Sequence, residues 1–231
     1  MKQGLPVLLS VNGGYVDTAG FLALQGLFTA HVTGNFVTFG ASLVLGTSGA
    51  GAKLLALPVF CVVVILSRLL CAGLERRQIP ILRTLLVLKM LLLAAGAALA
   101  IHFGPFHDGD ALPAIVTGMV LVTAMALQNG MHRAHMSTTP PTTLMTGTTT
   151  QIMIDLADLM RGVGPEARAA AKGRLGKMSA SVIGFAFGCA AAAGLFLVVR
   201  EWAFAVPPVI AFIGVLVTGD VQASPVAPTA R

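Results

Sequence analysis

Seven apolar stretches separated by short polar connections leave this chain of 231 residues few folds to choose from. The stretches run over 15–46, 54–74, 84–102, 113–131, 142–160, 178–199 and 202–218. Only 10% of the residues are charged and 56% are hydrophobic, so a water-soluble domain of this length would lack polar surface to cover its core. About 20 apolar residues cross a bilayer as a helix. The sequence therefore predicts an all-α fold, a polytopic membrane helical bundle that forms a single transmembrane domain over 1–231.

Charge in the connections predicts the orientation of the chain. The connection at 75–83 carries Arg76, Arg77 and Arg83, and the connection at 161–177 carries five basic residues against one acid. The connection at 102–110 has two acids and no Lys or Arg. Because positive loops stay in the cytoplasm, both basic connections are expected inside and 102–112 outside. The excess of positive charge thus follows the membrane topology and does not indicate a nucleic-acid partner.

This orientation limits the number of crossings. Between the outer connection at 102–112 and the inner one at 161–177 the chain must cross an odd number of times, yet two apolar stretches lie there. We therefore expect one crossing made of two helical pieces, interrupted at 132–141. The stretch at 15–46 fits the same description, with a break near Thr33-Gly34-Asn35. The prediction is six crossings with both termini in the cytoplasm.

The two broken segments resemble each other in sequence. Ala23-Leu24-Gln25-Gly26 is echoed by Ala126-Leu127-Gln128-Asn129-Gly130, and Thr33-Gly34-Asn35 by Thr146-Gly147-Thr148. Each broken segment precedes two ordinary spans, and a three-crossing unit that occurs twice must invert in the membrane. The expected repeats are 10–102 and 113–218, followed by a flexible C-terminal tail at 219–231. Chance matches in an apolar chain of low complexity are the alternative.

Four short motifs also resemble a known family. They read "GGYVDTAGF" at 13–21, "VTGNFV" at 32–37, "QNGM" at 128–131 and "TTLMTGT" at 142–148. In this order and in these apolar settings they resemble the signatures of the YoaK family of bacterial multi-pass membrane proteins. The resemblance runs from about residue 10 to residue 218. It implies a helical protein of the bacterial inner membrane and names no substrate.

The two breaks are the strongest candidates for a binding site. Unpaired backbone groups are costly in hydrocarbon, so a break is tolerated only where protein or water satisfies it. Gly34 and Gly147 permit unusual backbone geometry, and Thr33 and Thr146 are expected to cap helical pieces at 35–46 and 148–160. Two helix N-termini would then face the centre of the protein and favour an anion. The alternative is that both breaks are packing kinks.

Other polar residues in the spans have two interpretations each. Gln25, Gln128 and Asn129 either line the same pocket as Thr33, Gly34, Asn35, Thr146, Gly147 and Thr148 or join helices by hydrogen bonds. Asp17 is a candidate for carrying a coupling proton if it lies deep in the first span, and an interfacial residue if that span begins at Tyr15. Arg68 and Lys89 are expected to snorkel to the cytoplasmic surface or to attract an anion.

Two further groups of polar residues are given structural roles. Asp155 and Asp158 share one helical face and are expected to pair with Arg161 or Lys177 at the membrane surface. His132 and His135 lack a third ligand in a metal-binding pattern, so no metal is predicted. The sequence lacks the nucleotide and hydrolase motifs, and we expect neither a cofactor nor an enzyme.

The leading functional hypothesis is a small secondary transporter or channel. Its solute would be small and polar, preferably anionic, and would bind at the midplane between the two broken helices. The rival hypothesis is a membrane scaffold or partner subunit whose breaks serve packing alone, and an intramembrane enzyme ranks third. The expected partners are membrane lipids, the solute and, as a candidate, a second copy of the chain in a homodimer.

Overall fold

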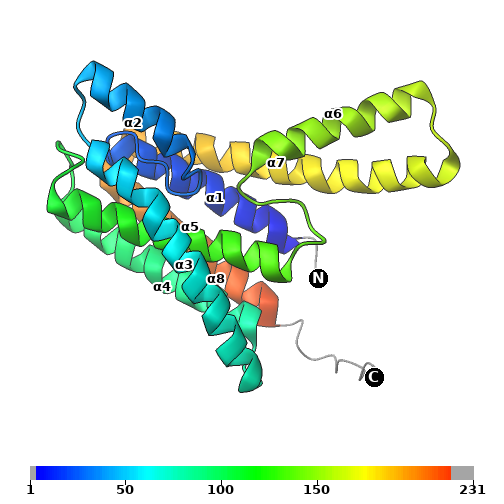
Figure 1. The fold of residues 1–231 in the computed structure, drawn as a ribbon, viewed down its shortest axis with the longest axis horizontal. Helices are drawn as coiled ribbons and strands as arrows, with labels where there is room; N and C mark the ends of the chain where they lie inside the picture. The colour runs from blue at the N-terminus through cyan, green and yellow to red at the C-terminus, as the bar shows by residue number, and fades with distance from the viewer. Residues whose placement is uncertain (1–3, 220–231) are drawn as a thin grey trace.

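The computed structural model describes residues 4–219, and within them the chain is helical with no strand. The elements are α1 (Gly4–Ala23), α2 (Gly34–Leu45), α3 (Ala50–Arg76), α4 (Ile81–Phe103), α5 (Leu112–His135), α6 (Met145–Arg161), α7 (Pro165–Val199), the 3₁₀ helix η1 (Arg200–Ala205) and α8 (Val206–Gly219). Most of them gather into one bundle, from which α6 and the first half of α7 project together as a hairpin (Figure 1). The tail expected at 219–231 lies, apart from its first residue, outside the described residues.

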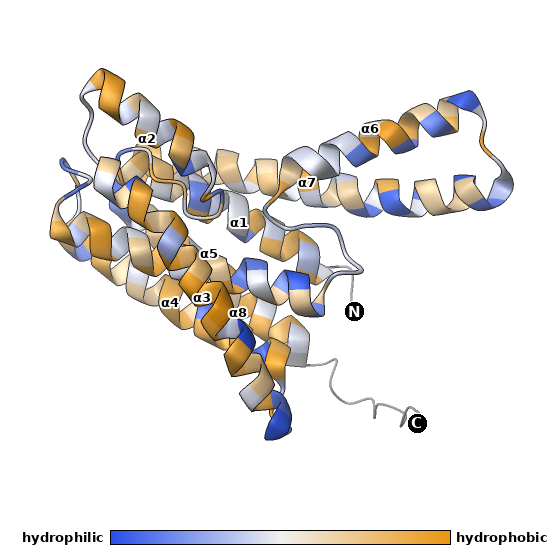
Figure 2. Ribbon diagram, viewed as in Figure 1, coloured by the Kyte–Doolittle hydropathy of each residue, from blue (hydrophilic) through white to orange (hydrophobic). Residues whose placement is uncertain are grey.

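The helices are compatible with a multi-pass membrane protein. Four helical segments are long and apolar enough to cross a bilayer: α3, α4, α5 and the continuous segment Pro165–Thr218. Large apolar side chains such as Val44, Leu69 and Leu197 point outwards, while Asn12, Asp17 and Lys89 are buried. Figure 2 shows hydrophobic residues along the bundle and hydrophilic ones at the end of α3 and along the projecting hairpin. This distribution suits a bundle surrounded by lipid.

Small residues bring α1 and α7 together. A Cβ added at Gly188 would lie 2.1 Å from the Val11 carbonyl oxygen, and one added at Gly14 would lie 2.2 Å from the Phe185 carbonyl oxygen. Gly184 faces Val7 in the same way, so the two helices run parallel. Such contact between backbones is the usual role of glycine in membrane helix pairs.

The first break differs from the sequence prediction. The helix begins at Gly4 rather than near residue 15, because Gly13 and Gly14 are helix-packing residues and not turn formers. With 20 residues, α1 alone is about 30 Å long. The backbone N–H of Thr29 then lies beside Asp17, so the connection 24–33 folds back along α1 before α2 begins. The chain therefore does not continue from α1 into α2 as two pieces of one crossing.

The second break repeats this geometry. Helix α5 continues through the expected interruption to His135, and the non-helical connection covers 136–144 instead of 132–141. Thr142 lies beside Gln128, so this connection also folds back along the preceding helix. From here on, connection 1 denotes residues 24–33 and connection 2 denotes residues 136–144.

Candidate binding cavity between the two connections

Connection 1 is held in place by the carboxylate of Asp17. Its Oδ1 accepts hydrogen bonds from the backbone N–H groups of Thr29 and Ala30, both at 2.7 Å, and from the Thr29 hydroxyl at 3.3 Å. Its Oδ2 lies 2.6 Å from Nδ1 of His31. The helix start at Gly4 places Asp17 inside the bundle, where its side chain is 5% exposed. Asp17 thus satisfies backbone donors that a non-helical segment leaves without partners.

Asn35 closes the other end of connection 1. Its Oδ1 accepts from the Phe28 N–H at 2.9 Å and its Nδ2 donates to the Phe28 carbonyl at 2.8 Å. The Phe28 ring in turn lies over Gly34, where an added Cβ would come within 3.1 Å of it. The Asn35 side chain, which is fully buried, therefore holds the turn together.

Connection 2 is held by amides rather than by a carboxylate. Gln128 Nε2 donates to Thr142 Oγ1 at 3.0 Å, and the Thr143 hydroxyl donates to Asn129 Oδ1 at 2.5 Å. Asp17 and the Gln128-Asn129 pair therefore do the same work on the two connections. The internal repeat in the sequence instead matched Gln128 with Gln25. Gln25 lies beyond the end of α1 and donates to the Phe106 carbonyl at 2.9 Å.

The two connections meet around a cavity of about 760 Å³. Ala30, His31, Val32 and Thr33 line it from the first segment, and Pro141 to Leu144 with Gly147 and Thr148 line it from the second. Helix α3 adds Phe60, Val64, Ser67, Arg68 and Cys71, and α5 adds Asn129, Gly130 and residues 132–134. The volume lies within the range of small-molecule sites. One cavity thus contacts both motifs that the sequence singled out.

The charged groups on the cavity wall are all basic. Arg68 and Arg133 line it, together with the imidazoles of His31 and His132, and no Asp or Glu belongs to the lining. Both arginines are exposed, and neither is in an ion pair within residues 4–219. The wall also has apolar parts, including Phe60 and Val64. Such a wall favours an anion over a cation.

A second cavity of about 510 Å³ adjoins the first one. It lies between α1, α7 and the start of α2, and its lining includes Asp17, Phe185 and Gly34. His31 and Thr33 line both cavities. The His31 ring packs edge-on against Phe185, and the backbone of Thr143 lies close to it. His31 therefore connects the two cavities and both connections.

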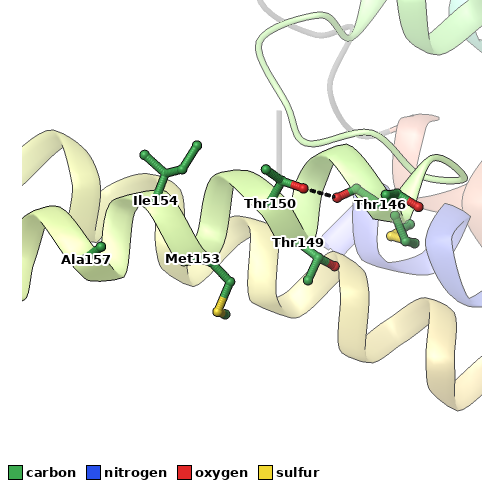
Figure 3. Close-up of a pocket in the computed structure, with 7 residues that line it drawn as sticks. Thr146, Thr149, Thr150, Met153, Ile154 and Ala157 are labelled. Atoms are coloured by element: carbon green, nitrogen blue, oxygen red, sulfur yellow. Dashed lines mark hydrogen bonds between the residues drawn. The ribbon is translucent and has the colours of Figure 1, made fainter.

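The predicted site residues divide into three groups. Thr33, Asn129, Gly147 and Thr148 line the larger cavity, and Gly34 lines the smaller one. Asn35 and Gln128 are buried in the hydrogen bonds described above, and Gln25 lies elsewhere. Thr146 faces away, into a groove on the outer side of α6 that it shares with Thr149, Thr150, Met153, Ile154 and Ala157 (Figure 3).

The predicted helix caps are wrong in detail. Thr33 precedes α2, but its side chain makes no capping hydrogen bond. Helix α6 begins at Met145, so Thr146 is inside its first turn and Leu144 occupies the cap position. Leu144 has no hydroxyl to cap the helix, and the Thr146 carbonyl accepts from the Thr150 hydroxyl at 3.0 Å. The start of each short helix nevertheless lies at a cavity wall.

Sequence reasoning missed several residues of the cavity. Arg133 and Ser67 were not singled out, although a charge at the end of an apolar span is a visible signal. Phe60 and Val64 carry no signal, since they are ordinary apolar residues of α3. Lys89 was expected to snorkel or to attract an anion, but it is 1% exposed and donates to Gln128 Oε1 inside the bundle, so snorkelling is wrong.

The projecting hairpin has its own ion pairs. Arg174 on α7 donates two hydrogen bonds to Asp155 on α6, at 2.7 and 3.1 Å, and holds the pKa of that carboxyl below its usual range. Asp158 pairs with Arg161 as expected, at 3.1 Å, whereas the partner expected for Asp155 was Arg161 or Lys177. The pair between Asp155 and Arg174 fastens α6 to α7 outside the bundle. Among the described residues, no three His, Cys, Asp or Glu side chains are placed to hold a metal ion.

Comparison with known proteins gives one match. The family model described as "Protein of unknown function (DUF1275)" matches residues 5–217. No curated protein matches the chain. No solved structure matches it either. The match covers both connections and all the helices that line the cavity, and it does not bear on the name YoaK.

Proposed function

We propose a function for this protein, which belongs to the DUF1275 family, described as proteins of unknown function. The protein is a small secondary transporter or channel for a small polar anion. The solute would bind in the larger cavity, between connection 1 and connection 2. The observation that carries the proposal is the shared cavity, whose wall takes residues from both motifs and is basic without any acid.

The packing of the helices supports an inverted repeat of α1–α4 and α5–α8. Helix α1 packs on α7 as α5 packs on α3, and α2 packs on α3 as α6 packs on α7. Helix α4 contacts α5 as α8 contacts α1. Both long pairs run parallel, since Ala52 lies near Asp110 and Ser67 near Gly130 on α3 and α5. These units extend the repeats expected at 10–102 and 113–218 by a few residues.

In this proposal six helices cross the membrane: α1, α3, α4, α5, α7 and α8. Each connection and the short helix after it form a re-entrant segment, which enters and leaves on the same side. Non-helical backbone at membrane depth is tolerated where it lines a cavity or is buried in protein, and the bonds of Asp17, Asn35 and Gln128 meet that need. With six crossings and the positive loops inside, both termini would lie in the cytoplasm.

The basic wall and the two short helices supply the preference for an anion. The first turn of α6 lines the larger cavity through Gly147 and Thr148, and α2 begins directly after Thr33 of the same lining. A helix N-terminus carries about half a positive charge. Thr33 offers a hydroxyl beside Arg68 and Arg133 in the same lining. The Thr148 hydroxyl, which donates to the Leu144 carbonyl at 3.1 Å, would turn from that carbonyl to a bound anion. Together these groups can replace part of the hydration shell of an anion.

One observation favours the rival function, a membrane scaffold. The connections are held by hydrogen bonds from Asp17, Asn35 and Gln128, as a motif that serves packing alone would require. A scaffold, however, gives no reason for a cavity of this volume with four basic side chains on its wall. Water in that cavity therefore distinguishes the two functions.

Accessibility of introduced cysteines tests the proposal. In a protein whose three native cysteines are replaced, Thr33→Cys and Thr148→Cys place thiols in the cavity, while Thr146→Cys places one in the outer groove of α6. A charged, membrane-impermeant thiol reagent applied from the cytoplasmic side should label positions 33 and 148. It should spare position 146, because in this proposal the outer face of α6 lies against lipid. Complete protection of positions 33 and 148 would support the scaffold.

A further inference from the structure

Lys89 is a buried amine whose only hydrogen-bond partner in the described chain is an uncharged amide. It lies in the middle of α4, 1% exposed, and donates to Gln128 Oε1. No acidic group of residues 4–219 lies within ion-pair distance of it. An ammonium without a counter-ion is costly inside protein, and an ionisable residue at membrane depth is usually functional.

The helices that pack against Lys89 provide no charged group that pairs with its amine. Helix α4 packs against α5, α8, η1 and α3. The described part of α8 has no titratable side chain, and Glu201 of η1 lies at the far end of α4, beside Gly104. The titratable groups of α5 are in its last turn, and those of α3 are Lys53, Cys61, Arg68, Cys71, Glu75 and Arg76. None of these groups bonds to Lys89 among the contacts of the described residues.

A chain of donors runs from Lys89 to the cavity. The Lys89 amine donates to Gln128 Oε1, and Gln128 Nε2 donates at 3.0 Å to Thr142 Oγ1 and at 3.0 Å to the Leu9 carbonyl. Thr142 lines the larger cavity, and within residues 4–219 its hydroxyl donates to no other group. Each group therefore directs its hydrogen towards the cavity, and hydrogen bonds in such a row strengthen one another.

We infer that Lys89 binds one proton when an anion enters the larger cavity, an inference that rests on the proposed function. The amine lone pair takes a proton supplied by the buffered cytoplasmic solution, where the conjugate base of the buffer remains. The resulting ammonium strengthens the row of donors that ends at the anion. One positive and one negative charge enter together, so the step is electrically neutral. By linkage, the proton and the anion raise each other's affinity by the same factor.

Nitrogen NMR of the lysine side chains tests this inference directly. The chain has five lysines, Lys2, Lys53, Lys89, Lys172 and Lys177, so ε-¹⁵N-lysine protein in liposomes gives few signals, and Lys89→Met assigns one of them. About one unit above neutral pH, with gluconate as the bulky bath anion, the Lys89 signal should be that of a neutral amine. Adding nitrate, methanesulfonate or benzenesulfonate, in separate samples, should convert it to the ammonium signal for any anion that binds.

Lys53 is the matched control, because it is 3% exposed but donates to Ser42 Oγ at 2.6 Å and to the Ser48 carbonyl. Its signal should not respond to the anion. Equilibrium dialysis with the same radiolabelled anions should show affinity rising by up to about tenfold per pH unit as the pH falls. The rise should be smaller in Lys89→Met and Lys89→Gln, in which only the imidazoles of His31 and His132 remain on the cavity wall to bind a proton.

Two results overturn the inference. One is an ammonium signal from Lys89 before any binding anion is added, and the other is an anion that binds while Lys89 remains neutral. In the second case the proposed function stands and only the coupling fails. If none of the three anions binds, the inference falls together with the anion specificity of the proposed function.

Discussion

Nδ1 of His31 lies 2.6 Å from Oδ2 of Asp17, while Oδ1 of the same carboxylate accepts the N–H groups of Thr29 and Ala30. Asp17 therefore fixes the non-helical chain next to both cavities, and His31 is the side chain that reaches both of them. Asp17 thus holds connection 1 in place and also lies at the candidate site. Substitutions of Asp17 can distinguish its structural role from a role in transport.

Asp17→Ala should lower the stability of the protein by roughly 3 kcal/mol or more, because it leaves two buried N–H groups and a hydroxyl without an acceptor. Asp17→Asn keeps one oxygen and should lose less. Thermal unfolding in detergent measures both. If Asp17 instead carries a coupling proton, Asp17→Asn should keep full stability and solute exchange while losing proton-linked uptake.

Gly188→Ala should destabilise the protein by more than about 2 kcal/mol, because the new Cβ would meet the Val11 carbonyl oxygen at 2.1 Å. Gly194→Ala on the same helix is the matched control, since nothing lies within 4 Å of its added Cβ. Thermal unfolding of the two variants should show a large difference in midpoint. Equal midpoints would contradict the parallel contact between α1 and α7.

The hairpin of α6 and α7 should loosen in acid. Because the bond to Arg174 lowers the pKa of Asp155, the pair stabilises the folded hairpin above the ordinary carboxyl pKa of about 4, and this contribution is lost as the pH falls through the lowered value. The protection of residues 150–175 against hydrogen exchange, taken relative to the intrinsic exchange rate at each pH, should fall in acid in the wild type. Asp155→Asn should exchange faster already at neutral pH, while Asp158→Asn, which breaks the exposed pair with Arg161, should not.

Reporter fusions test the membrane topology. Fusions at Glu75, at Gly164 and at the C-terminus should read cytoplasmic, and one at Asp108 should read external. In the proposed topology α4 crosses between Glu75 and Asp108, α5 crosses between Asp108 and Gly164, and α7 and α8 both cross between Gly164 and the C-terminus. Gly164 is the informative position, since it follows the re-entrant segment. An external reading there would make α6 a full crossing and remove the inverted repeat.

The helical membrane class could be predicted from sequence because apolar stretches and charge in loops are signals of single segments. The family match over residues 5–217 supports an uncharacterised family, in line with motifs that resemble one without a substrate. The ends of the breaks could not be predicted, because Gly13-Gly14 and "HRAH" look like turns by composition. Contact with α7 keeps the first pair helical, and α5 simply continues to His135.

The candidate site was predicted in part, for a similar reason. The motif residues Thr33, Gly147 and Thr148 line the cavity. Thr146 does not, because α6 already begins at Met145 and its helical geometry directs the Thr146 side chain into the outer groove. The equivalence of Asp17 with Gln128 was hidden, since a carboxylate and an amide do not align by identity. The equivalence lies in the contacts, because each side chain binds the connection that follows its own helix.

Uptake by proteoliposomes measures the central claim, that the shared cavity carries an anion. Vesicles with the purified protein are placed in solutions of radiolabelled small organic acids and inorganic anions, one anion at a time. They should accumulate at least one of these anions above protein-free vesicles. Thr148→Val removes a cavity hydroxyl and Thr146→Val removes one in the outer groove, each at nearly constant volume. We predict that Thr148→Val and Arg68→Gln lower this uptake at least fivefold and that Thr146→Val leaves it unchanged. No uptake of any anion in the panel, or an equal loss in both threonine variants, would contradict the account.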